Sequence, residues 1–207
     1  MSYQIKIPSY TCGGEGCIEN VPSIIEKEHA RKIMVFTDKG IRATGLLDVL
    51  TKILDTTDAE YKIFDDLTPE PAYQDVERVM DEADQYEGDF IIAIDGGSVM
   101  DAAKLCSVLK GASYTVKDLL KDPGIAEKQI KTLMIPTTCG TGSEATCNAI
   151  VAIPEEQSKK GIVNDNMIPD YVFLDSQMIR RLPKSIIAAT GVDALAHVVE
   201  CFTSKKA

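Results

Sequence analysis

Two side chains near the end of the sequence, Asp193 and His197, have the types and spacing of a ligand pair for a divalent metal. The segment from about Lys184 onward has the pattern of a helix, and residues four apart lie on one face of a helix. A carboxylate oxygen beside an imidazole nitrogen suits Fe(II), Zn(II) or Mn(II). The same spacing also suits a salt bridge or a polar helix face, so both interpretations stay open.

A closed metal site needs more ligands than this pair provides. Metals of this kind take about four to six donors, and the other histidine, His29, lies far upstream in a different predicted element. The sequence ends at Ala207, shortly after the pair. We therefore expect either that the pair binds no metal, or that the chain is a fragment whose missing part holds the remaining ligands.

The elements before this pair alternate between short apolar runs and amphipathic stretches. That order predicts an α/β fold, a Rossmann-like parallel sheet with helices on both faces. The predicted strands cover residues 3–7, 32–38, 61–64, 90–95, 131–136 and 171–175, and the segment 11–16 is a predicted turn. The predicted helices cover about 18–28, 40–54, 73–86 and 99–110, and a hairpin is predicted at 149–153 and 160–163.

We place a domain boundary near residue 182. Residues 1–181 are expected to form a dinucleotide-binding α/β domain, and residues 182–207 the beginning of an all-helical metal-binding domain.

Composition is that of an ordinary globular protein, with 44% hydrophobic and 26% charged residues among 207. The net charge of −10 argues against a nucleic-acid or anionic-membrane partner. No signal-peptide core and no run of about 18 apolar residues is present, which argues against a membrane span. The six cysteines include no CxxC pair and are expected to be reduced, in the cytoplasm. Cys106 and Cys201 are expected in the core.

Ligands of parallel sheets bind at the carboxyl ends of the strands. At one such end, Gly96 and Gly97 would let backbone N–H groups approach a phosphate at the positive end of a helix dipole. The alternative is that Ser98 is only an N-cap, with Asp101 as its capping-box partner. The sequence has neither the three-glycine dinucleotide fingerprint nor a P-loop, so a nucleotide site would be of another type.

Two further strand ends carry polar side chains. Asp38 closes the first βα unit, where a carboxylate can bind both hydroxyls of an adenosine ribose and repel a 2′-phosphate, or can act only as a helix N-cap. A hydroxyl-rich loop follows the strand at 131–136, and it could enclose a phosphate or be an ordinary polar loop capped by Ser143. Lys159, at the hairpin tip, is either solvated or reaches a cofactor.

Three stretches together resemble one family, the iron-containing (group III) alcohol dehydrogenases. They are DGGSVMDAAK at 95–104, IPTTCGTGSEAT at 135–146 and LPKSIIAATGVDALAHVVECFTS at 182–204. The resemblance implies hydride transfer between a short-chain alcohol or aldehyde and a dinucleotide, NAD rather than NADP. It also implies one divalent metal, usually Fe(II) and in some members Zn(II), and a homo-oligomer such as a dimer.

The resemblance also implies roles for individual residues. Asp193 and His197 would be two of four metal ligands, the other two being histidines absent from this chain. Asp101 would lie close to the reactive end, and we assign it as the catalytic residue. The dinucleotide would be bound by Asp38, Gly96, Gly97, Ser98, Thr137, Thr138, Thr141, Thr146 and Lys159.

Three positions differ from the family pattern. Asp95 stands where a third glycine is usual, and an acid beside the pyrophosphate should weaken binding unless it points away. Glu70 replaces an asparagine that many members have between two prolines, and Cys139 replaces a common alanine.

Two alternatives to this assignment remain open. One is a zinc enzyme of the same fold, of the glycerol dehydrogenase or dehydroquinate-synthase type, against which TTCGTGSEAT argues. The other is a nucleotide-binding module without catalysis, if 207 residues is the natural length.

Overall fold

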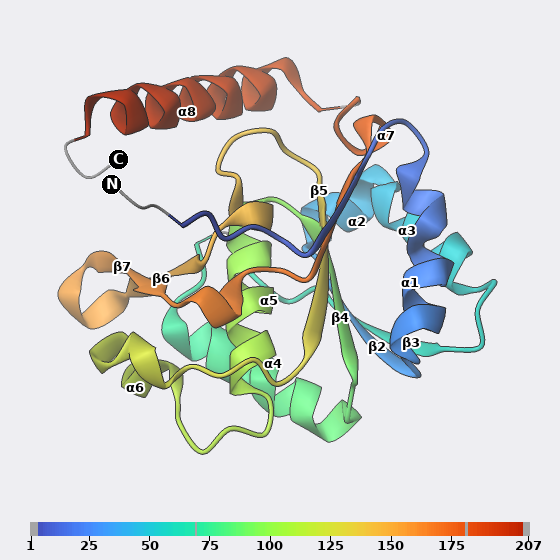
Figure 1. The fold of residues 1–207 in the computed structure, drawn as a ribbon, viewed down its shortest axis with the longest axis horizontal. Coiled ribbons are helices and arrows are strands. Elements are labelled where there is room, and N and C mark those ends of the chain that lie inside the picture. Colours follow the sequence, from blue (N-terminus) through green and yellow to red (C-terminus); the bar gives the residue numbers. More distant parts are fainter. Residues whose placement is uncertain (1–3, 69, 181, 205–207) are drawn as a thin grey trace.

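The chain forms a six-stranded parallel sheet with helices on both faces, as the sequence predicts (Figure 1). The computed structural model describes residues 4–68, 70–180 and 182–204. The strand order is β1-β8-β5-β4-β2-β3. The strands are β1 (Tyr10–Gly13), β2 (Lys32–Phe36), β3 (Glu60–Phe64), β4 (Phe90–Asp95), β5 (Lys131–Pro136) and β8 (Tyr171–Leu174). An antiparallel hairpin of β6 (Asn148–Ile153) and β7 (Ser158–Val163) confirms the predicted hairpin.

The helices vary widely in length. The α-helices are α1 (Val21–Glu28), α2 (Lys39–Thr44), α3 (Leu46–Leu54), α4 (Tyr73–Tyr86), α5 (Gly97–Leu109), α6 (Val116–Lys121), α7 (Ser176–Ile179) and α8 (Lys184–Thr203). Short 3-10 turns are η1 (Cys17–Asn20), η2 (Pro123–Ile125), η3 (Ser143–Ala145), η4 (Pro154–Glu156) and η5 (Asp165–Met167).

A separate hydrophobic core lies on each face of the sheet. The central strands β2, β4 and β5 are apolar almost throughout and are buried on both sides, as parallel strands between two helical layers must be. On one face they pack against α4, α5 and α6, and on the other against α1 and α3. Both cores hold the carboxyl ends of these three strands in fixed register.

The structure corrects three local predictions. The first strand is β1 at Tyr10–Gly13, which overlaps the turn predicted at 11–16, whereas residues 4–7 form no strand and residues 1–3 lie outside the described part. β1 is an edge strand that exists because it pairs with β8. The helix predicted at 40–54 is interrupted at Gly45, whose φ of 76° is left-handed. The helix predicted at 99–110 begins two residues earlier, at Gly97.

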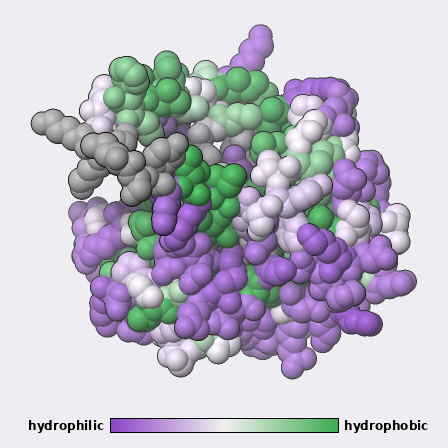
Figure 2. Space-filling model, viewed as in Figure 1, coloured by the Kyte–Doolittle hydropathy of each residue, from purple (hydrophilic) through white to green (hydrophobic). Residues whose placement is uncertain are grey.

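Helix α8 lies apart from the sheet and has no buried residue (Figure 1). Its apolar side chains therefore cover one end of the molecule, at the top of Figure 2. Cys201, predicted in the core, is exposed like most residues of this helix, whereas Cys106 is buried as predicted. Among the described helices, α8 alone has the length and the apolar composition that a membrane-spanning helix needs. Length and composition alone do not distinguish such a helix from one of a water-soluble protein.

Candidate functional site

The polar strand ends singled out in the sequence meet at one edge of the sheet. β5, β4 and β2 are neighbours, and their ends carry Thr137, Asp95 and Asp38. The N–H of Thr137 donates to the carbonyl of Asp95 at 2.9 Å. The hydroxyl of Thr37 donates to the carbonyl of Ile94 at 3.0 Å. These bonds extend the sheet pairing past the strands, so the three ends form one surface.

The glycine turn begins helix α5 in a way that differs from the capping-box alternative. Gly96 is the N-cap, in extended conformation, and no side chain caps the helix. Ser98 therefore lies inside the helix, where its hydroxyl accepts from the N–H of Glu70 at 3.3 Å. The capping-box interpretation of Ser98 and Asp101 is wrong, because α5 starts before Ser98.

The threonine loop lies directly over this turn. A Cβ atom added to Gly97 would stand 2.7 Å from Oγ1 of Thr141, and one added to Gly96 would stand 3.4 Å from Oγ1 of Thr138. Position 97 requires a glycine because the side chain of Thr141 lies too close to leave space for a Cβ atom. The backbone φ of Gly97 is not unusual. The glycine turn and the threonine loop, predicted separately, form one site.

Thr137 adds an unusual feature to that site. Its side chain is fully buried, and its Oγ1 has no hydrogen-bond partner among the described residues. Buried polar atoms are nearly always bonded, so an unpaired hydroxyl at a strand end is a group with which a bound ligand could form a hydrogen bond.

Asp38 is the N-cap of α2, which confirms the helix-cap interpretation of this residue. Its Oδ1 accepts from the N–H of Ile41 at 2.6 Å. The side chain is half-buried, and capping occupies only one of its two oxygens. Capping and ribose binding are therefore compatible.

A buried ion pair links α5 to the segment after the threonine loop. Nζ of Lys104 is fully buried and lies 2.9 Å from Oδ1 of Asp101. Asp101 also accepts from the hydroxyl of Ser143 at 2.5 Å and from the N–H of Ile150 at 3.0 Å. Burial lowers the pKa of Lys104, and the Asp101 charge opposes that shift.

The Lys104 ammonium holds this segment through several acceptors. It donates to the carbonyl of Ser143 at 3.0 Å, to Oγ1 of Thr146 at 3.1 Å and to the carbonyl of Asn148. Sequence reasoning assigned Lys104 no function. The signal that could have found it is a single lysine inside the apolar run of α5, three residues after Asp101.

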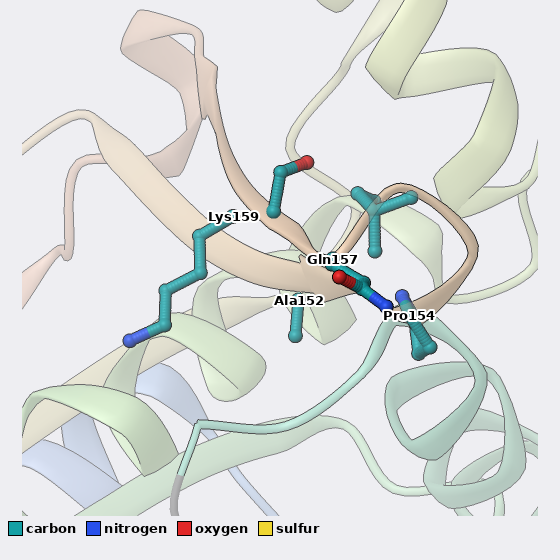
Figure 3. A pocket seen from close by; sticks show the side chains of 6 residues that line it. Ala152, Pro154, Gln157 and Lys159 are labelled. Carbon is teal, nitrogen blue, oxygen red and sulfur yellow. The ribbon is translucent and has the colours of Figure 1, made fainter.

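Lys159 contacts a segment that is distant in sequence. Its Nζ lies 2.6 Å from Oε1 of Glu70, and both side chains are more than half exposed. A surface hollow of about 260 Å³ lies beside Lys159 at the hairpin turn, and Figure 3 shows the Lys159 side chain extending away from Pro154 and Gln157. This hollow is lined by hairpin residues and includes none of the strand-end residues named above.

The proposed metal ligands are adjacent on α8 as predicted. Nδ1 of His197 lies 3.9 Å from Oδ2 of Asp193, and both side chains are about half exposed. Their donor types fit a divalent metal. No cluster of three or more potential metal ligands occurs among the described residues, so this pair fits only part of a ligand set.

The residues at the strand ends fit a dinucleotide better than the pair on α8 fits a closed metal site. Gly97 allows the threonine loop to lie closely over the turn, and Thr137 offers an unpaired hydroxyl. Both lie at the N-terminal end of the 13-residue helix α5, where backbone N–H groups and the helix dipole attract anions.

Comparisons with known proteins identify the family of this chain. Residues 8–176 match the family model described as iron-containing alcohol dehydrogenase. The long-chain-alcohol dehydrogenase 1 of Geobacillus thermodenitrificans is 31% identical over 207 residues, which cover 99% of this chain and 52% of that protein.

Two solved structures have the same fold. An iron-containing alcohol dehydrogenase from Thermotoga maritima has a TM-score of 0.89 at 34% identity, over 99% of this chain and 56% of that one. A sulfoacetaldehyde reductase from Bifidobacterium kashiwanohense, solved in complex with NAD+, has a TM-score of 0.89 at 27% identity, over 99% and 54%. The chain thus spans about half the length of the relatives it matches.

Proposed function

Because the chain belongs to the iron-containing alcohol dehydrogenase family, we propose that it carries the dinucleotide-binding half of a metal-dependent oxidoreductase. The reaction is hydride transfer between NAD and a short-chain alcohol or aldehyde. The observation that carries the proposal is the meeting of the glycine turn and the threonine loop over the ends of β4 and β5. The NAD+ complex of the sulfoacetaldehyde reductase supports the choice of cofactor.

Each group of residues has a distinct task in this proposal. The N–H groups at the start of α5 bind the pyrophosphate, with Gly97 allowing the close approach and Ser98 beside it. Oδ2 of Asp38 receives the adenosine ribose hydroxyls. The hydroxyls of Thr137, Thr138, Thr141 and Thr146 would lie along the bound dinucleotide. A dinucleotide held by these residues would supply the hydride acceptor, and a metal held by Asp193, His197 and further ligands would supply Lewis acidity for the alcohol oxygen.

We assign Asp101 a positioning role in place of the catalytic role expected from the sequence. Its two oxygens are committed to Lys104, Ser143 and Ile150, so the pair fixes the loop that the cofactor contacts. Lys159 reaches the nicotinamide ribose only by leaving Glu70, and an exposed ion pair of this kind costs little to break.

We also propose where the protein works. Six unpaired cysteines suit a reducing compartment such as the cytoplasm. The boundary between the dinucleotide-binding domain and the helical metal-binding domain is placed between residues 181 and 182, and the active form is a homo-oligomer.

Cofactor binding tests Asp38 first. Asp38→Ala should raise the dissociation constant of NAD by roughly 10- to 100-fold, since hydrogen bonds to charged groups contribute about 1.5–3 kcal/mol. Calorimetric titration measures the change. NADP should bind weakly to the unaltered protein, because the carboxylate opposes a 2′-phosphate.

A matched variant separates ribose binding from helix capping. Serine is as good an N-cap as aspartate, so Asp38→Ser keeps the cap of α2 and removes the carboxylate. It should lose NAD affinity as Asp38→Ala does. Unchanged NAD affinity in Asp38→Ser would reduce Asp38 to a structural cap.

Catalysis tests the metal pair. A catalytic site generally takes at least three protein ligands with one position open, and this chain supplies two. We therefore expect a chain that ends at Ala207 to bind NAD without oxidising ethanol, propanediol or butanol when Fe(II) or Zn(II) is added. NADH absorbance measures turnover for this chain and for a longer chain that includes the missing half.

The His197→Ala variant of the longer chain is the control for that assay. It should lose metal-dependent turnover and keep NAD binding, because the two sites use different residues. Turnover by the 207-residue chain, or an unimpaired His197→Ala variant, contradicts the metal assignment. NAD binding without turnover in the longer chain favours the module without catalysis.

A further inference from the structure

Asp95, at the end of β4, is a buried acid with one free oxygen. Its residue is 7% exposed. Oδ1 accepts from the N–H of Gly96 at 2.6 Å, the residue that begins the glycine turn. Oδ2 is buried and has no hydrogen-bond partner among the described residues. The side chain is therefore held at the glycine turn by its Oδ1, and Oδ2 makes no hydrogen bond of normal length to any described residue.

The surroundings of Asp95 contain a second acid. Asp38, at the end of β2, raises the pKa of Asp95 by charge repulsion. The groups that face Asp95 from β2, from the start of α5 and from β5 are Thr37, Gly96 and Thr137, which carry no charge. No ion pair among the described residues includes Asp95, whereas the nearby cations Lys39 and Arg42 pair with Asp66 and Asp65.

Burial is the main influence on the protonation of this group. It raises the pKa of the Asp95 carboxyl from 3.8 to about 7, and the Asp38 charge adds to the shift. The N–H groups of Gly96 and Asp38 and the hydroxyl of Thr37 act in the opposite direction. Near neutral pH, both the neutral and the ionised carboxyl are therefore present in the free protein.

We propose that Asp95 is a further contact residue of the dinucleotide site, and that its neutral carboxyl group donates a hydrogen bond from Oδ2 to an oxygen of the pyrophosphate. The complex therefore retains one proton on Asp95. This inference rests on the proposed function. It accounts for an acid at a position where the family has glycine, because a neutral carboxyl is a donor, whereas an ionised one repels the pyrophosphate.

The sign of the pH dependence follows from this proton. Below pH 7 the carboxyl is already neutral and binding needs no proton. Above pH 7 each complex takes up one proton, so the dissociation constant of NADH should rise by roughly tenfold per pH unit. The dinucleotide itself does not titrate between pH 6 and 9. Fluorescence titration of NADH at pH 6, 7, 8 and 9 measures the slope, and calorimetry in two buffers of different ionisation enthalpy counts the proton.

Two substitutions at Asp95 and one control identify the group responsible. Asp95→Asn keeps the shape and a donor but cannot ionise, and Asp95→Gly restores the usual family residue. Both should bind NADH with a flat pH profile between pH 7 and 9. Asp66→Asn removes an exposed acid that pairs with Lys39 near Asp38 and should keep the slope of the unaltered protein.

The outcomes separate this inference from the proposed function. A flat profile in the unaltered protein, or a slope that persists in Asp95→Asn and Asp95→Gly, overturns the inference while leaving the dinucleotide site in place. A slope lost in Asp66→Asn also overturns it, because the titrating group is then another acid. Absence of NADH binding at every pH in the unaltered protein and in all variants overturns both proposals.

Discussion

Lys104→Met is expected to lower the free energy of unfolding by about 3–5 kcal/mol, the usual cost of removing one partner from a buried ion pair. The Asp101 carboxylate would stay buried without its cation. The carbonyls of Ser143 and Asn148 would each lose a donor. Urea denaturation followed by circular dichroism measures the loss.

Lys121→Met is the matched control for this prediction. Lys121 pairs with Asp118 at the same three-residue spacing, but its side chain is 78% exposed. Water screens such a pair, so this variant should leave the free energy of unfolding nearly unchanged. Equal losses in the two variants would show that burial of the Asp101–Lys104 pair is not what stabilises this region.

Gly97→Val is expected to abolish dinucleotide binding while the fold survives. The added Cβ would stand 2.7 Å from Oγ1 of Thr141 and 3.2 Å from its Cγ2, so the threonine side chain must move and change the turn that we propose binds the pyrophosphate. The neighbouring atoms belong to a side chain on a loop, so the sheet itself is not disturbed. Calorimetric titration measures NAD binding, and circular dichroism checks the fold.

Gly161→Val provides the comparison for this glycine. Gly161 lies in the hairpin strand β7, and a Cβ there meets nothing within 4 Å. Valine suits a strand, so this variant should bind NAD normally. Retained binding in Gly97→Val would mean that the glycine turn does not approach the pyrophosphate.

The positions of the strand ends could be predicted because the central strands are recognisable from their local sequence pattern alone. β4 and β5 are buried on both faces, so each is a continuous apolar run that ends at Asp95 or just before Thr137. The parallel arrangement then brings the ends together without further information. The N-cap position of Asp38 follows equally from its place between a strand and a helix.

The parts that could not be predicted depend on distant partners. β1 has no strong strand pattern and forms because β8 pairs with it. Lys104 carries a charge, and charged side chains are usually exposed to solvent. It can be buried because hydrogen-bond acceptors about 40 residues further along the chain surround its ammonium group. The Glu70–Lys159 pair joins a proline-rich loop to a hairpin tip, a contact that exists only after the hairpin has packed beside α4.

The pairing of β1 with β8 sets an order on the synthesis of this chain. Tyr10 lies opposite Tyr171, and Gly13 opposite Leu174, so β1 can pair only after β8, about 160 residues later in the chain, has been synthesised. Until then β5 has an unpaired edge, which is a template for wrong pairing. Contacts of such sequence separation form slowly. We therefore expect the outer edge of β5 to stay unpaired during translation until residue 174 has emerged.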